Sequence, residues 1–462
     1  MNGLVKGGLA LGGLVLGLGA LRRALNPTPR YAPWEKPPYG EFEKKVLVLG
    51  GGFGGYTAAT DLCKLIGKRD DVGVLVIARD NFFTFWPMVP GIVSSDIDAR
   101  NVAQPLRRAL ILAGASFRRA KVKGIDTNKK VVEADGGLEF PYDQLIISLG
   151  GQPNFFGIPG VEEHSMTMRG VEDAVRLRNR VIERFEEVSL IRDEVPESKL
   201  TFVVIGGGAT GVEVASEIHT LVHENLAPDY PNIDPYRVRI YLIEALPNIL
   251  PELDPALRRA ARARLLNERI EVLTGAMAEE ITGDCVKLKG GKQIDTENVV
   301  WTAGNRPNQT IQDLGLPYDV RTGIKVDLSL RVEGHSDIWA VGDCAAVQDV
   351  HQEGAIVPPT AQAAIQQGHL VARNVLKTID GDGDLGEFEY KPLGQLVELG
   401  SDFAVNEVMG VRFTGMIAAV FWRMAYLVRL NSPQSKVRVA ADWIVGLFLR
   451  PAVTQIRGTS EE

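Results

Sequence analysis

The stretch Lys45–Gly55 reads KVLVLGGGFGG, an apolar strand that runs directly into a turn of the form Gly-x-Gly-x-x-Gly. A helix from Tyr56 is expected to follow. Glycines at this spacing permit a tight turn, let backbone N–H groups approach a pyrophosphate, and let the helix pack against the strand. The stretch therefore predicts a Rossmann-like dinucleotide-binding unit in an α/β fold. The residues predicted to bind the dinucleotide are Gly50, Gly52, Phe53, Gly54 and Gly55.

A second unit of the same kind follows later in the chain. Leu200–Ile205 (LTFVVI) leads into Gly206–Gly211 (GGGATG), and a helix is expected over Val212–Leu221. The next strand ends in Glu244, where a carboxylate would bind a ribose diol. Because no cation for a 2′-phosphate follows at 245–247, this unit is predicted to prefer NADH to NADPH. The residues predicted to bind NADH are Gly206, Gly208, Gly211 and Glu244.

The first unit lacks such an acid. Its second strand, Val74–Ile77, is followed by Ala78, which occupies the usual position of the ribose-binding residue. Either Asp80 serves instead from the following turn, or Arg79 and the backbone hold the adenosine end. The two units therefore predict two different dinucleotides, one a bound flavin and the other a nicotinamide.

The composition is that of a globular protein with more than one domain. The chain has 462 residues, of which 45% are hydrophobic and 24% charged, so wholesale disorder is excluded. Its three cysteines lie more than 50 residues apart, which excludes a disulfide scaffold, a CxxC redox pair and a cysteine-rich zinc site. No metal is predicted. The net charge of -7 argues against nucleic acid as a partner.

Both ends of the chain are basic and apolar. Residues 1–32 carry +4 and residues 411–457 carry +6, which leaves -17 for the remainder. This distribution suggests a soluble body held against an anionic membrane surface. Gly7–Leu21 contains no charge, so residues 1–25 are predicted to form a membrane anchor, with a cleaved signal peptide or a flexible tail as the alternatives. A proline-rich linker, 26–43, follows.

The C-terminal region predicts two amphipathic helices. Apolar side chains recur at helical spacing from Ile417 to Val428 and again from Val437 to Leu449, with a break at 431–433. Cations and aromatic rings on such helices are typical of attachment to one face of a membrane. Residues 385–462 are therefore predicted to associate with the membrane surface. A helical lid on the body or a dimer interface is the alternative.

Asp337–Asp343 reads as a strand that ends in Gly-Asp. With the two glycine-rich units, it resembles the flavoprotein disulfide-reductase superfamily, whose members bind two dinucleotides. The resemblance implies that Asp343 binds the flavin ribitol, and that Gly150 and Gly304 belong to the two segments that cross between the domains. The domain limits expected on this basis are 44–165 and 300–378 for FAD, with 166–299 inserted for NADH.

The segment after this aspartate predicts a helix with an open N-terminus. Two prolines block an earlier start and Thr360 is a good N-cap, so the helix is expected to begin at Ala361. Its free N–H groups and positive dipole end would then face outward, as the pyrimidine end of a reduced, anionic flavin requires. Ala361 is therefore a predicted cofactor-binding residue.

Two glutamines on this helix identify a family. Gln362 and Gln366 lie at i and i+4, so their amides share one face. The segment Ala361–Gly368, AQAAIQQG, resembles the quinone-site signature of type II NADH dehydrogenases, which are non-electrogenic NADH:quinone oxidoreductases. Asn154–Val161 and Gly206–Glu213 resemble that family too. The similarity runs in order from about residue 44 through the C-terminal helices.

The resemblance implies a role for five further side chains. Gln362 and Gln366 would line the quinone side of the flavin, and Glu213 would lie near the nicotinamide. Lys391 and Glu172 match positions proposed in the family for charge or proton handling near the quinone. These four, Gln362, Gln366, Lys391 and Glu172, are the predicted catalytic residues. FAD would accept a hydride from NADH and pass two electrons to a membrane quinone without proton pumping.

Taken with the basic ends, this implies an enzyme on the cytoplasmic face of the cell membrane. It would be peripheral or monotopic, with or without one N-terminal transmembrane helix, and its partners would be a membrane quinone and surface lipids. Whether it forms a homodimer is left open. The alternatives are a related flavin oxidoreductase with another acceptor and a flavoprotein that senses NADH.

Overall fold

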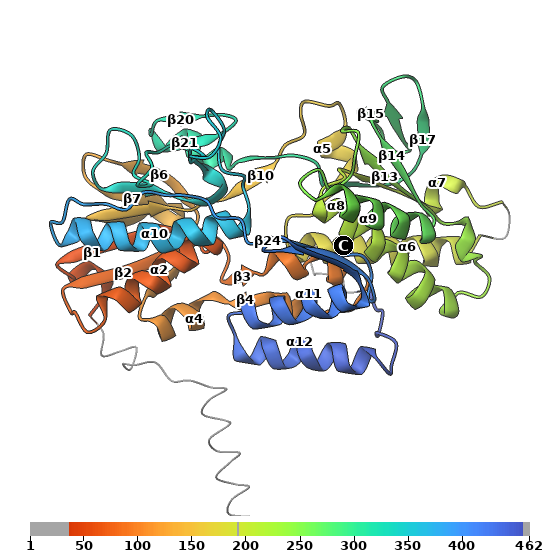
Figure 1. Ribbon diagram of the computed structural model, residues 1–462, viewed down its shortest axis with the longest axis horizontal. Coiled ribbons are helices and arrows are strands. Elements are labelled where there is room, and N and C mark those ends of the chain that lie inside the picture. The colour runs from red at the N-terminus through yellow and green to blue at the C-terminus, as the bar shows by residue number, and fades with distance from the viewer. Residues whose placement is uncertain (1–36, 192–193, 456–462) are drawn as a thin grey trace, which may run out of the picture.

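The two glycine-rich units lie in separate lobes of the computed structural model, which describes residues 37–191 and 194–455. The strand of each unit belongs to a parallel sheet of five strands. Figure 1 shows the lobes side by side, and the second lobe is inserted in the chain between two parts of the first. The predicted α/β fold, with one dinucleotide-binding domain inserted in another, is confirmed. The predicted anchor, residues 1–25, lies outside the described residues.

The first lobe is built on a sheet in the order β22-β9-β1-β2-β5. Its strands are β1 (Lys44–Leu49), β2 (Val72–Ala78), β5 (Ser116–Arg119), β9 (Gln144–Ile147) and β22 (Ile338–Ala340). The apolar residues of β1 are buried because strands flank it on both sides. Helix α2 (Phe53–Ile66) packs against α10 (Ala361–Ile379). A Cβ at Gly368 would lie only 2.8 Å from the Gly54 carbonyl oxygen, so the missing side chain lets the two helices touch.

The second lobe repeats this plan with the order β11-β18-β12-β13-β14. Its strands are β11 (Ser165–Thr167), β12 (Thr201–Ile205), β13 (Arg239–Glu244), β14 (Ile270–Thr274) and β18 (Asn298–Trp301). Its main helices are α6 (Val171–Ser189), α8 (Ala209–Thr220) and α9 (Pro255–Asn267). The carboxyl ends of β12 and β13 meet at one edge of this sheet, where the second glycine-rich loop begins.

Shorter elements complete the lobes. In the first they are β3 (Phe82–Thr84), η3 (Pro90–Ile92), α3 (Ala99–Val102), β4 (Ala103–Pro105), α4 (Leu106–Ala113), β6 (Val122–Asp126), β7 (Val131–Ala134), β8 (Leu138–Pro141), β20 (Tyr318–Asp319), β21 (Gly323–Lys325) and β23 (Ala345–Ala346). In the second they are α5 (Val161–His164), α7 (Glu197–Leu200), η5 (Leu221–Leu226), β15 (Ala278–Ile281), β16 (Cys285–Leu288) and β17 (Gln293–Asp295).

Two short strands carry the chain between the lobes. β10 (Gly151–Pro153) pairs in antiparallel fashion with β19 (Asn305–Pro307). Gly150 and Gly304 precede these strands and have φ values of 70° and 72°, which residues other than glycine rarely adopt. The two predicted crossing segments therefore lie together and form the link between the two sheets.

The C-terminal region forms a three-stranded sheet followed by two helices. The strands are β24 (Gly394–Glu398), β25 (Ala404–Val408) and β26 (Val411–Gly415), and the helices are α11 (Met416–Arg429) and α12 (Pro433–Gly446). Both predicted helices are present, and Ser432 caps α12 at the predicted break. In Figure 1 they run along one edge of the molecule, beneath the junction of the lobes. None of the described helices is both long enough and apolar enough to cross a membrane.

Candidate active site

The first glycine-rich loop is closed so tightly that it requires glycine. Gly50 has φ 101°, and a Cβ there would lie 2.0 Å from the Ser148 carbonyl oxygen. A Cβ at Gly55 would lie 2.1 Å from the Gly50 carbonyl oxygen. Gly52, in contrast, faces open space and is the N-cap of α2, with no side chain bonded to the helix end. The free N–H groups of the first turn, including Phe53 and Gly54, therefore suit a pyrophosphate.

The second loop has the same construction. A Cβ at Gly211 would lie 1.8 Å from the Gly206 carbonyl oxygen, whereas Gly208 faces open space and caps α8 without a side-chain bond. Glu244 ends β13 beside this loop. Its Oε2 accepts the N–H of Gly207 at 2.6 Å and its Oε1 accepts the N–H of Leu246 at 2.7 Å. The predicted carboxylate therefore lies at the loop where a dinucleotide ribose would lie.

Both helices begin earlier than the sequence predicted. α2 begins at Phe53 rather than Tyr56, and α8 begins at Ala209 rather than Val212. The last three residues of each glycine motif already have helical geometry, because the third glycine must pack against the loop from within the first helical turn. The earlier start brings the positive end of each helix directly to the turn.

A cavity of about 210 Å³ lies beside Asp343, at the carboxyl end of the first sheet. It is lined among others by Asn305, Asp343, Thr360, Ala363 and Gln367. Asn305 donates its side-chain amide to Asp343 Oδ2 at 2.8 Å, and Gln367 Oε1 accepts the N–H of Gly342 at 2.6 Å. Burial raises the pKa of Asp343, and the Asn305 amide opposes that shift. A half-buried carboxyl group facing a cavity fits the hydroxyl groups of a flavin ribitol.

The N-terminus of α10 opens onto the same cavity. Thr360 caps the helix as predicted, and its Oγ1 accepts the N–H of Ala363 at 3.2 Å. Thr360, Ala363 and Ala364 all line the cavity, and Ala361 is the first residue of the helix. The Thr360 turn is therefore next to Asp343, as binding of one flavin by both would require.

The two predicted glutamines hold one segment of backbone. Gln362 donates to the Gly394 carbonyl oxygen at 2.6 Å and accepts the N–H of Leu393 at 3.1 Å. Gln366 donates to the Lys391 carbonyl oxygen at 2.8 Å and accepts the N–H of Lys391 at 3.1 Å. Each amide thus donates one hydrogen bond and accepts one, and together they fix the entry into β24 against α10.

The structure brings Lys391, but not Glu172, to the glutamines. The Lys391 side chain is 72% exposed and its Nζ lies 3.3 Å from Glu389 Oε2. Glu172 is an exposed residue in the first turn of α6. Among the described residues it makes no hydrogen bond or ion pair with Gln362, Gln366 or Lys391.

Residues of the first unit that were considered for the ribose point outward. Arg79 Nη2 lies 3.1 Å from Asp80 Oδ2, and the Arg79 side chain is 77% exposed. A Cβ at Gly51 would meet Leu106 and Ala78, so the space beside this loop is apolar. No group of histidine, cysteine and acidic side chains in the described part of the chain could hold a metal ion.

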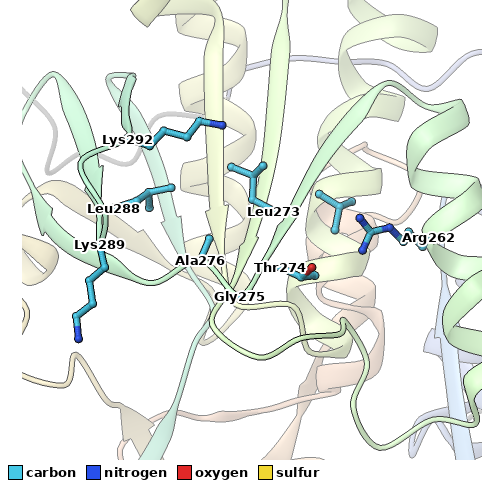
Figure 2. A pocket seen from close by; sticks show the side chains of 9 residues that line it. Arg262, Leu273, Thr274, Gly275, Ala276, Leu288, Lys289 and Lys292 are labelled. Atoms are coloured by element: carbon cyan, nitrogen blue, oxygen red, sulfur yellow. The ribbon is translucent and has the colours of Figure 1, made fainter.

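A second pocket, of about 350 Å³, lies at the end of β14. Figure 2 shows Arg262 on one side of it and Lys289 and Lys292 on the other, with Gly275 in the loop between them. The N–H of Gly275 donates to the Leu246 carbonyl oxygen, so this pocket lies near the loop after Glu244. The cations of this pocket come from parts of the chain well after Glu244. The residues directly after Glu244 therefore do not predict them.

Comparison with known proteins decides the family. The model of the pyridine nucleotide-disulphide oxidoreductase family matches residues 44–368. The chain belongs to this family. It is 32% identical over 411 residues to a probable NADH dehydrogenase of Dictyostelium discoideum, covering 87% of this chain and 89% of that protein. It is 29% identical over 450 residues to the type II NADH:quinone oxidoreductase Ndh of Mycobacterium tuberculosis, covering 94% of each.

The fold of this oxidoreductase also matches a solved structure. The structure of NDH2 from Plasmodium falciparum in complex with NADH superposes with a TM-score of 0.80, at 20% identity, over 89% of this chain and all of that one. The resemblance to type II NADH dehydrogenases that the sequence motifs predicted is confirmed by these relatives.

Two residues near this oxidoreductase's site, Arg169 and Asn305, were not predicted from the sequence. Arg169 Nη1 donates to Asn305 Oδ1 at 3.2 Å, and its guanidinium lies 5.6 Å from the centre of the Trp86 ring. Asn305 directly follows the Val299–Gly304 motif and was within reach of sequence reasoning. Arg169 carried no signal, because its partners lie 83 and 136 residues away in the chain.

Glu213, predicted near the nicotinamide, lies on α8 and is buried. Its Oε1 accepts the backbone N–H of Glu398, at the end of β24, at 3.4 Å. Burial raises the pKa of Glu213 well above its usual range, and this hydrogen bond opposes the shift only in part. The residue therefore links the second lobe to the C-terminal sheet.

Proposed function

We propose that this chain is an FAD-dependent NADH:quinone oxidoreductase of the type II class. The observation that carries the proposal is that the Asp343 carboxyl group and the capped N-terminus of α10 line one cavity. The glutamines that brace the start of β24 lie on the same helix. Bound FAD would supply hydride acceptance from NADH and two-electron donation to the quinone.

The protein's own part is to bind and orient. The N–H groups of α2 would hold the FAD pyrophosphate and Asp343 its ribitol, while Ala361 and the α10 dipole would stabilise negative charge on the reduced ring. Gly208 and Glu244 would hold NADH by its pyrophosphate and ribose. Gly150 and Gly304 would let the two crossing strands approach the rings.

The quinone would enter between the first lobe and α11. Phe53, at the start of α2, contacts Phe85, with ring centres 6.0 Å apart. Phe85 in turn contacts Tyr426 of α11 at 5.9 Å. This row of aromatic rings leads from the first glycine-rich loop to the apolar C-terminal helices, and it suits a flat, lipid-soluble acceptor. Lys391 and Glu172 stay predictions for charge or proton handling.

The C-terminal helices would attach the enzyme to the membrane surface. The outward face of α11 presents Ile417, Val420 and Met424, which are 78%, 56% and 55% exposed. On α12, Lys436 and Arg438 supply positive charge for anionic lipid. We infer a peripheral protein on the cytoplasmic face. The N-terminal anchor stays an expectation, and whether the protein forms a homodimer stays open.

The proposal is tested with the purified protein on lipid vesicles that contain a quinone. NADH absorbance should fall only when quinone is present, and the vesicle interior should not change its pH. NADPH should be oxidised far more slowly. Absence of quinone-dependent NADH oxidation would overturn the proposal. Binding to anionic but not neutral vesicles, lost at high salt, would support attachment through the basic helices.

A further inference from the structure

Four carboxyl groups and one guanidinium meet where the two lobes join the C-terminal region. Glu213 and Glu217 come from α8, Glu398 from the end of β24, Asp96 from the loop after η3, and Arg423 from α11. Arg423 Nε lies 3.3 Å from Glu398 Oε1, and its Nη2 lies 3.4 Å from Asp96 Oδ2. We call these five residues the junction cluster.

One guanidinium cannot neutralise four carboxylates. Glu217 is only 4% exposed, and its Oε2 has no hydrogen-bond partner among the described residues. Burial raises the pKa of Glu217 well above its usual range, and the charges of Asp96 and Glu398 raise it further. Burial also raises the pKa of Glu398 to about 8, although Arg423 opposes that shift. At neutral pH the cluster therefore keeps protons that exposed carboxyl groups have lost.

The cluster reaches from water into the protein. The Asp96 side chain is 25% exposed, that of Arg423 18% and that of Glu398 11%, while Glu217 is buried. Asp96 is thus the point where a proton can enter. Among the neighbouring titratable groups, the charge of Asp96 acts on Glu224, and the charges of Glu213 and Glu398 act on Tyr426, which Arg429 also influences.

The cluster is connected to the proposed quinone side of the protein through β24 and Tyr426. Glu398 ends β24, and the first residue of that strand, Gly394, is held by Gln362. Four residues of extended chain span only about 13 Å. Tyr426 connects the two places from the other side, because the charges of Glu213 and Glu398 act on its hydroxyl group while its ring contacts Phe85.

We propose that Asp96, Glu217 and Glu398, bridged by Arg423, store a proton and deliver it to the quinone during its reduction. The inference rests on the proposed function. Reduction of the quinone takes two electrons and two protons, and NADH supplies both electrons and one proton as a hydride. The second proton would leave a carboxyl group of the cluster and pass through water to the quinone oxygen, forming an O–H bond on the quinol, and water would reprotonate the carboxylate through Asp96. The carboxyl groups themselves are neither oxidised nor reduced.

The experiment measures the two half-reactions separately in the FAD-loaded protein. In Glu398→Gln and Glu217→Gln, reoxidation by a short-chain quinone should slow by roughly tenfold or more at pH 8, in the range of general acid catalysis. Reduction by NADH should keep its native rate. Glu217→Gln is the safer variant for folding, since Oε2 has no hydrogen-bond partner to lose and the amide oxygen of glutamine can still accept from Ser94.

A matched control is Glu268→Gln. Burial raises the pKa of Glu268 to about 7, but this carboxyl group is paired with Arg264 at 2.5 Å and with Ser216 at 2.7 Å. It should therefore leave reoxidation unchanged. Two cluster variants with native flavin content and a native pH profile of reoxidation would overturn the inference. A native protein that quinone does not reoxidise would overturn the proposed function as well.

A readout without turnover comes from pH and stability. A carboxyl group whose pKa is higher in the folded state makes unfolding easier as pH rises from its unfolded to its folded pKa. For Glu398 this window runs from about 4.5 to about 8. The Tm of Glu398→Gln relative to the native protein should rise across it, and the infrared band of protonated carboxyl groups at pH 7 should weaken. An unchanged band and a constant Tm difference would contradict the inference.

Discussion

The two glycine-rich loops share a backbone but differ in what stands beside them. In the second loop the N–H of Gly207 is bound by Glu244, while the corresponding Gly51 of the first loop faces Leu106 and Ala78. A carboxylate binds a ribose diol through hydrogen bonds and allows the ligand to be released, whereas an apolar wall encloses its ligand. The difference fits a nicotinamide that must exchange in every cycle and a flavin that stays bound.

The largest effect on ligand binding is expected when a side chain is added inside either glycine-rich loop. Gly55→Ala places a Cβ 2.1 Å from the Gly50 carbonyl oxygen, and Gly211→Ala places one 1.8 Å from that of Gly206. Gly55→Ala should yield protein without flavin, and Gly211→Ala should yield yellow protein that NADH no longer bleaches. Flavin absorbance per chain and an NADH titration measure both. The proposed difference between the loops is wrong if the two variants have the same flavin content and the same response to NADH.

Removing the acid should weaken one site only. Glu244→Ala removes the carboxylate proposed to bind the NADH ribose, and hydrogen bonds to charged groups contribute about 1.5–3 kcal/mol. The KM for NADH should rise about tenfold or more, with flavin content unchanged. The matched variant Asp80→Ala, in the exposed pair with Arg79, should leave both quantities as they are. A Glu244→Ala enzyme with a native KM would remove the distinction drawn above.

A smaller effect should appear in the acid stability of the flavin site. Asn305→Ala removes the amide that opposes the raised pKa of Asp343, so this pKa rises further. The ionised carboxylate is the stronger acceptor for ribitol hydroxyl groups. As pH falls, flavin release, followed by its fluorescence, should therefore begin at a higher pH in the variant. Release at the native pH would show that Asp343 does not hold the flavin through its charge.

The smallest change concerns the open glycines at the helix ends. Gly52→Ala and Gly208→Ala meet no protein atom within 4 Å, so neither should alter the Tm of the ligand-free protein by more than a degree or so. Each should weaken its own ligand by a few-fold, because the open space is where the phosphates are proposed to lie. Dissociation constants for FAD and NADH measure this, and a crossed effect would contradict the assignment of the loops.

Sequence reasoning succeeded where the signal is local. The glycine spacing, the Thr360 cap and the apolar stripes of α11 and α12 each depend on residues within a few positions of one another. It misplaced the start of α2 by three residues, since nothing local shows that Phe53 already lies in the first turn. Hydrophobic periodicity and capping residues therefore predict the presence of a helix more reliably than the residues at which it begins and ends.

Contacts between distant segments could not be predicted. Gln362 and Gln366 were expected to face the quinone, and only the fold shows their amides bound to backbone 25 to 32 residues later. The junction cluster joins Asp96 to Arg423 across 327 residues. Such charges look like ordinary surface residues in the sequence, because burial is a property of the whole fold.

All the roles assigned above require one flavin bound between the two loops. The most direct test is the visible spectrum of the purified protein under anaerobic conditions. We expect one flavin per chain, with a band that one equivalent of NADH removes and a quinone restores. A protein without a flavin band, or with a band that NADH leaves unchanged, would contradict this expectation.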